Sequence, residues 1–227
     1  MRFAKIFQQS TGLRPTYHIV DEQNNVIGIS KISLMFAWGL KLVFNEDYQI
    51  KERIEYRIFD NIANLFKMLL GLPFKIMHLK NNETNSDMGR VFFEKRSLAK
   101  RAGQYTIQHN KNNYEGYRVY RGKLGEALTI VKDGKTCAMA VRPYKRTNLL
   151  NNYVICAVDD VLMQLAIDFV MYFELARGDN FGKMANSKET LFRYSSKERL
   201  KHFDEEFWNN MLAQMQNMHE VSWFTES

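Results

Sequence analysis

The chain is poor in the features that mark secreted and membrane-spanning proteins. It has only two cysteines in 227 residues, Cys137 and Cys156, which are far apart and form no CxxC pair. This usage suits a reducing compartment and buried thiols, and it provides no disulfide framework. Residues 1–12 contain no apolar segment of the signal-peptide kind. We therefore expect a cytoplasmic protein. The three prolines, with many Asn and Lys residues, suggest an AT-rich bacterial genome.

Motifs of catalysis and metal binding are also missing from the sequence. The five histidines show no HxH, HxxxH or HExxH spacing, so we expect no metal site. There is no GxSxG, no P-loop and no GxGxxG after a predicted strand. The cysteines lie in apolar segments and are better explained as small buried hydrophobes than as nucleophiles. The sequence thus predicts a protein without catalytic activity and without a cofactor.

What the chain does have is a large apolar content and a modest excess of positive charge. Hydrophobic residues make up 45%, which allows a sizeable core and excludes global disorder. Lys and Arg number 32 against 25 Asp and Glu, giving a net charge of +7. This charge favours acidic partners such as an anionic membrane surface, nucleic acid or an acidic protein, although simple solubility would also explain it.

Most of the first 156 residues read as short strands that recur about every 8–13 residues, as in a sandwich or a barrel. Several of them alternate polar and apolar residues, which is typical of half-buried strands. Asp133-Gly134 joins two segments and is the strongest hairpin signal. The predicted strands cover 2–7, 16–21, 26–32, 34–44, 73–80, 90–95, 104–109, 116–122, 127–134, 135–142 and 152–158.

Residues 158–176, VDDVLMQLAIDFVMYFELA, predict a helix that is apolar almost all the way round. Such a helix either spans a membrane or lies in a protein core. The uninterrupted apolar part is shorter than the ~20 residues of a span, and Asp168 in its middle would be costly in lipid. We therefore predict a core helix, with Val161, Leu165 and Phe169 all buried. Asp168 must then be hydrogen bonded or protonated, either as a structural group or as part of a site.

The order of these elements, many strands followed by one apolar helix, resembles the tubby C-terminal-like superfamily, which includes LURP-one-related proteins and phospholipid scramblases. IDFVMYFE at 167–174 is similar to the end of the scramblase helix, and Asp160 matches an acidic residue before it. YHIVDEQNNVIGISK at 17–31 is similar to the opening hairpin of the LURP-one-related group. The resemblance covers residues 1–177 and identifies the chain as a bacterial member of the superfamily.

This resemblance implies a mainly β (α+β) fold, an antiparallel barrel of about twelve strands that encloses a central hydrophobic helix near 159–176. It does not imply scramblase activity, because the proline-rich tail and the cysteine cluster of scramblases are absent. Asp159 and Asp160 are too few ligands for calcium. Tubby binds phosphoinositide headgroups through basic residues of its barrel, but those positions have no assigned counterparts in this sequence.

Two amphipathic segments are additions to the family pattern. Residues 51–70 place apolar side chains on one helical face before Gly71 and Pro73, which predicts a helical insertion. In the extension at 178–227, Ser195 and Glu198 form an S-x-x-E capping box for a helix to about Met218. This second helix either docks on its own barrel or binds a protein partner. Its predicted contact residues are Phe203, Phe207, Trp208, Met211 and Met215.

Basic residues concentrate in three segments that we expect to be loops, with tyrosines among them. Brought together by a barrel, they would form a surface for phosphate groups. These candidate anion-binding residues are Lys95, Arg96, Lys100, Arg101, Arg118, Arg121, Lys123, Arg142, Lys145 and Arg146.

Two functions are consistent with these features. The first is a module that binds anionic phospholipid headgroups on the inner membrane face through the basic loops, which would make the protein peripheral to the membrane. The alternative is a protein-interaction module, regulatory or toxin-neutralising, that uses the amphipathic helices. Nucleic acid is disfavoured as a ligand, and the sequence leaves the oligomeric state open.

Overall fold

The computed structural model describes residues 1–10, 15–35, 40–46, 52–57, 74–81, 84, 86–94, 104–144, 150–177 and 195–215. Within these ranges the chain forms twelve β-strands, three α-helices and one 3-10 turn. The prediction of a mainly β, antiparallel protein with few helices is confirmed. The strands are β1 (Arg2–Gln8), β2 (Thr16–Val20), β3 (Val26–Met35), β4 (Leu40–Glu46), β5 (Glu52–Arg57), β6 (Phe74–Asn81), β7 (Asp87–Glu94), β8 (Gln104–His109), β9 (Asn112–Tyr120), β10 (Glu126–Lys132), β11 (Lys135–Arg142) and β12 (Asn152–Ala157).

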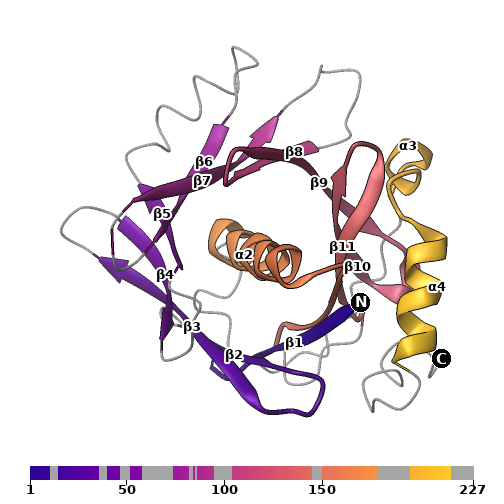
Figure 1. Cartoon of the computed structure of the whole chain (residues 1–227), viewed down its shortest axis with the longest axis horizontal. Coiled ribbons are helices and arrows are strands. Elements are labelled where there is room, and N and C mark those ends of the chain that lie inside the picture. The colour runs from indigo at the N-terminus through magenta and orange to yellow at the C-terminus, as the bar shows by residue number, and fades with distance from the viewer. Residues whose placement is uncertain are drawn as a thin grey trace.

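Each strand pairs antiparallel with its neighbours in sequence, and β1 also pairs with β12, with Ala4 opposite Ile155. The order of hydrogen-bonded neighbours therefore returns to its start (Figure 1). The β10–β11 hairpin turns at Asp133 and Gly134, whose φ angles of 50° and 76° are those of a type I′ turn. The predicted hairpin is confirmed.

Helix α2 (Asp160–Arg177) lies within the ring of strands in Figure 1. Leu165, Phe169 and Phe173 are at most 3% exposed, and their neighbours along the helix are buried as well, so the helix has no solvent-facing side along this stretch. Val161 was also predicted to be buried, and that prediction is wrong, because its exposure is 56%. It belongs to the first turn of α2, where the neighbouring Asp160 side chain is exposed too.

The alternation of residues along each strand separates two apolar clusters. On β11, Ala138 and Ala140 belong to the cluster that contains the α2 side chains, whereas Met139 and Val141 belong to a second cluster on the other face. The two inner-face alanines of β11 are small and leave room for the helix. At Gly116 a Cβ atom would come within 2.5 Å of the Phe169 ring, so that position of β9 accepts only glycine without rearrangement.

The second cluster is covered by the C-terminal residues, which lie beside β9, β10 and β11 in Figure 1. A short helix α3 (Lys197–Leu200) precedes α4 (Glu205–Gln214). The five predicted contact residues of this tail are at most 7% exposed and pack against the outer face of the sheet. The tail therefore docks on its own sheet, and this stripe is not accessible to a partner. The residues concerned are Phe203, Phe207, Trp208, Met211 and Met215.

The predicted capping box in this tail is wrong. Ser196, not Ser195, precedes α3, and its side chain makes no capping hydrogen bond. The Ser195 hydroxyl instead accepts a hydrogen bond from the backbone N–H of Tyr120, which ties the tail to β9. The longer helix α4 begins after Asp204, whose carboxylate accepts from the N–H of Phe207. The predicted end near Met218 lies outside the described residues.

The helical insertion predicted at 51–70 is wrong for its first part, because Glu52–Arg57 is strand β5, paired with β4 and β6. In these six residues Ile54 and Tyr56 alternate with charged residues. This period of two suits a strand between two partners, and it outweighs the helical spacing seen over the longer window. The rest of the predicted insertion, from 58 to 70, lies outside the described residues.

Candidate functional site: the polar end of the ring

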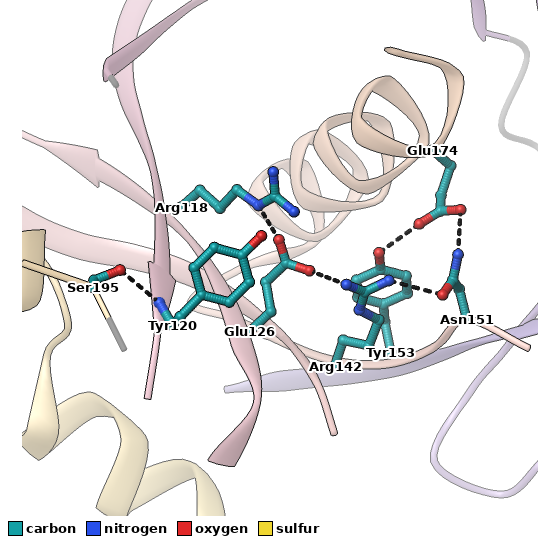
Figure 2. A network of polar contacts seen from close by, with 8 residues as sticks. All are labelled: Arg118, Tyr120, Glu126, Arg142, Asn151, Tyr153, Glu174 and Ser195. Atoms are coloured by element: carbon teal, nitrogen blue, oxygen red, sulfur yellow. Dashed lines mark hydrogen bonds and ion pairs between the residues drawn. The ribbon is translucent and has the colours of Figure 1, made fainter. Parts of the chain in front are cut away.

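One end of the ring is lined by polar and charged side chains, whereas the cluster around the middle of α2 is apolar. The ends of β9 and β11 and the beginnings of β10 and β12 meet here, with Tyr120 opposite Glu126 and Glu126 opposite Arg142 in the strand register. The last turns of α2 supply Glu174 (Figure 2). The polar residues therefore come from both the wall of the ring and the helix inside it.

Glu126 is the centre of one half of this network. Its carboxylate is 2% exposed and pairs with the guanidinium groups of both Arg118 and Arg142 (Figure 2). Burial is the largest effect on the pKa of Arg142 and lowers it, but Glu126, Tyr153, Glu174 and Tyr120 together more than offset it, and the net shift of the pKa is upward. The pKa of Arg118 is raised in the same way. Both arginines therefore stay charged and are bound to a carboxylate inside the protein.

Glu174 is the centre of the other half. Its carboxylate accepts hydrogen bonds from the hydroxyls of Tyr17 and Tyr153, at 2.8 and 2.6 Å, and from the amide of Asn151 at 2.8 Å. Asn151 also accepts a hydrogen bond of 2.8 Å from Arg142, which joins the two halves. Burial, followed by the nearby Glu174 charge, raises the pKa of Tyr153 well above its ordinary value. Tyr153 is therefore a neutral donor at physiological pH.

The composition of the network suits a structural role, in which it holds α2 in place. Its two carboxylates, Glu126 and Glu174, balance its two guanidinium groups, and each carboxylate binds side chains from more than one element. Buried charges are tolerated when they are paired and hydrogen bonded, and breaking such a pair is strongly destabilising. The contacts fix the C-terminal part of α2 against β2 and β12.

The structure corrects part of the predicted anion-binding set. Arg118 and Arg142 were expected in loops, but they lie on β9 and β11, because these strands continue to Tyr120 and Arg142. Arg142 is 1% exposed, so it does not form part of a surface. Arg121 pairs with Glu205 of the tail, and its guanidinium lies 4.6 Å from the centre of the Phe203 ring.

The other basic residues of that set are at the surface or outside the described ranges. Lys123 is exposed in the 3-10 turn η1 (Gly122–Leu124). The remaining six lie outside the described residues, namely Lys95, Arg96, Lys100, Arg101, Lys145 and Arg146.

The strands that flank the three basic segments nevertheless share one end of the ring. Glu94 pairs with Gln104, and Gln104 pairs with Tyr117. The register then continues through Tyr120 and Glu126 to Arg142. Segments 95–103, 121–125 and 143–151 connect these strand ends, so each begins and ends at the same edge of the sheet as the Glu126 network.

Sequence reasoning missed the acidic and aromatic members of the network. Glu126 carried the clearest signal, because it precedes Leu128 and Ile130 at the same alternating positions of β10 and therefore faces inward with them. Asp168 was expected to need a hydrogen bond. It is 1% exposed, and the Gln164 amide donates to it at 3.1 Å, one helical turn away.

Among the residues that the structure describes, no group of three or more His, Cys, Asp and Glu is arranged to hold a metal ion. No helix in the described ranges is long and apolar enough to cross a membrane. No protein-family model, curated protein or solved structure matches the chain.

Proposed function

We propose that the protein is a non-catalytic module that binds anionic phospholipid headgroups through the basic segments at the polar end of the ring. The observation that carries this proposal is the strand register, which gives segments 95–103, 121–125 and 143–151 a common edge. Eight of the ten candidate cations belong to these segments, although Arg121 among them pairs with Glu205, whereas Arg118 and Arg142 pair with the buried Glu126. Cations near an anionic membrane each contribute about 1 kcal/mol.

The proposal includes the finer architecture, a tubby-like barrel with α2 as its central helix. It is supported by the order of elements and by the LURP-one-like hairpin at 17–31. That stretch contains β2 and β3, which pair as neighbours. The burial of α2 around Phe169 is the packing that such an architecture needs.

The protein-interaction alternative is weakened by the same structure. It depended on two exposed amphipathic helices, but the apolar stripe of the tail is buried against the sheet and the start of the other segment is strand β5. No feature of the described residues favours a protein partner over a lipid.

Flotation with liposomes tests the proposal. Replacing Lys100, Arg101, Lys145 and Arg146 by Glu should abolish flotation with liposomes that contain anionic lipid. Binding of the unmodified protein should fall as salt rises, because exposed charges are screened over ~10 Å at 0.1 M. Equal recovery with neutral and anionic liposomes would refute the proposal.

A charge-matched control separates local binding from net charge. The pair Lys145→Glu and Arg146→Glu changes the charge by the same amount as the pair Lys111→Glu and Lys135→Glu. The second pair lies at the other edge of the sheet, with Lys111 in the β8–β9 turn and Lys135 at the start of β11, and both lysines are exposed. Only the first pair should reduce flotation. Equal losses would show that the total charge of the protein matters and not the proposed surface.

A further inference from the structure

The opposite end of the ring contains a hollow that none of the preceding sections uses. Its volume is about 480 Å³, enough for a small molecule, and it lies over the end of β6, the start of β7 and the β8–β9 turn. The polar side chains that matter in it are His78, Asp87, Arg90, Gln108 and Lys111.

The charge of this hollow favours an anion. Arg90 and Lys111 are two permanent cations, and Asp87 is the single carboxylate among the residues that line it. One oxygen of Asp87 already accepts a hydrogen bond from the backbone N–H of Gly89 at 3.0 Å. Its other oxygen lies 3.8 Å from His78 Nδ1. The cations are therefore in excess even with the histidines neutral.

Arg90 is held in a defined orientation. Its Nε donates to the Gln108 side-chain oxygen at 2.5 Å, and its guanidinium carbon lies 5.6 Å from the centre of the Phe92 ring. Within the described part of the chain, its two terminal nitrogens have no hydrogen-bond partner. A guanidinium oriented in this way presents a planar pair of donors that matches two oxygens of a carboxylate or phosphate.

Lys111 occupies a backbone position that normally favours glycine. Asn110 and Lys111 form the β8–β9 turn with φ angles of 45° and 66°, both in the left-handed region. At the equivalent turn between β10 and β11 the chain has Asp133 followed by Gly134. A lysine in this conformation is disfavoured relative to glycine. Such a residue is a reason to look for a function of its side chain.

We infer that this hollow binds a small soluble oxyanion of the phosphate or carboxylate type through the Arg90 guanidinium and the Lys111 ammonium. The two cations come from different elements, β7 and the β8–β9 turn, and both line the same hollow. Among the described residues, Lys111 has no ion-pair partner that a ligand would have to displace. The inference is independent of the lipid proposal, because the two surfaces lie at opposite ends of the strands.

Isothermal titration calorimetry on the full chain tests the inference, with sodium phosphate and sodium malonate as probes at constant ionic strength. The two probes distinguish tetrahedral phosphate from the planar carboxylate groups of malonate. We expect saturable binding of at least one of them. Arg90→Gln and Lys111→Gly should each weaken it about tenfold or more, because each removes a charged hydrogen-bond donor.

Lys111→Gly also separates function from folding. It should leave the melting temperature unchanged or raise it, because glycine suits the left-handed turn, while the affinity for the anion falls. Lys135→Ala, at an exposed lysine beside the other hairpin turn, is the matched control and should bind like the parent protein. Absence of saturable binding, or full affinity in Lys111→Gly, would overturn the inference. Flotation with anionic liposomes should be unaffected by Arg90→Gln, which keeps the outcomes for the two surfaces distinct.

Discussion

The hydroxyl of Tyr153 offers a direct measure of how firmly α2 is fixed inside the ring. Tyr153→Phe removes one oxygen and keeps the aromatic side chain otherwise unchanged. The main change is therefore the loss of one hydrogen-bond donor to Glu174. Hydrogen bonds to buried charged groups contribute about 1.5–3 kcal/mol. For a chain of this size each kcal/mol corresponds to roughly 2–4 °C. We therefore expect a melting temperature lower by roughly 3–12 °C and a lower urea midpoint with an unchanged slope.

Three further variants separate the effect of the network from the ordinary effects of removing a tyrosine hydroxyl. Tyr114→Phe deletes a hydroxyl on the inner face of β9, and within the described residues that hydroxyl has no hydrogen-bond partner. It should change stability little. Tyr17→Phe should behave like Tyr153→Phe, and the double variant should cost more than the sum of the two, because Glu174 would lose both of its tyrosine donors. A change below about 0.5 kcal/mol in Tyr153→Phe would refute the idea that Glu174 anchors the helix.

Three other predictions follow from the packing and the buried ionisable groups. Phe169→Ala should destabilise by about 3–5 kcal/mol in urea titrations by opening a cavity, and Gly116→Ala should also destabilise because its Cβ would meet the same ring; parental stability in both would contradict the observed packing. Deletion after Ser187 should lower the melting temperature and reduce solubility, because it uncovers the outer apolar cluster. Melting curves and light scattering measure the two effects, and an unchanged melting temperature with unchanged solubility would contradict the docking of the tail. Burial raises the pKa values of Cys156 and Tyr105 to about 12, from 9.0 and 10.0. The folded state holds these protons more tightly than the unfolded chain, so the contribution of Cys156 to stability is intact below pH 9 and that of Tyr105 below pH 10. Above these values each contribution falls by about 1.4 kcal/mol per pH unit, up to about pH 12. Cys156→Ala should flatten the fall between pH 9 and 10 in melting curves.

Most of the strands and helix α2 were predictable because each has a strong local pattern, although the single strand predicted at 34–44 spans the end of β3 and the start of β4. The β10–β11 pair shows alternation on both sides of Asp133-Gly134, and α2 is apolar around its whole circumference. Where a short strand lay inside a longer helix-like window, as at Glu52–Arg57, the longer pattern misled. The capping box predicted at Ser195 was also wrong. The Ser195 hydroxyl accepts its hydrogen bond from the backbone of a distant strand and not from its own helix.

The polar network was largely invisible in the sequence because its members are far apart along the chain. Tyr17 and Glu174 are separated by 157 residues, and only the closure of β1 on β12 makes their meeting possible. The basic residues were predicted as a binding surface because they cluster in the sequence. Clustering alone does not distinguish exposed cations from cations in buried ion pairs. Arg142 and Lys123 look alike in sequence, and burial separates a buried ion pair from an exposed cation.

The late position of α2 in the chain has a consequence for biosynthesis. During translation all twelve strands leave the ribosome before helix α2. One edge of β1 stays unpaired until β12 is synthesised, about 150 residues later. Until then the growing sheet exposes both an open edge and an apolar inner face, which are the surfaces that lead to aggregation. The large sequence separation of these contacts also predicts slow folding. We therefore expect the ring to assemble only after synthesis passes Arg177, with the nascent chain depending on chaperones until that point.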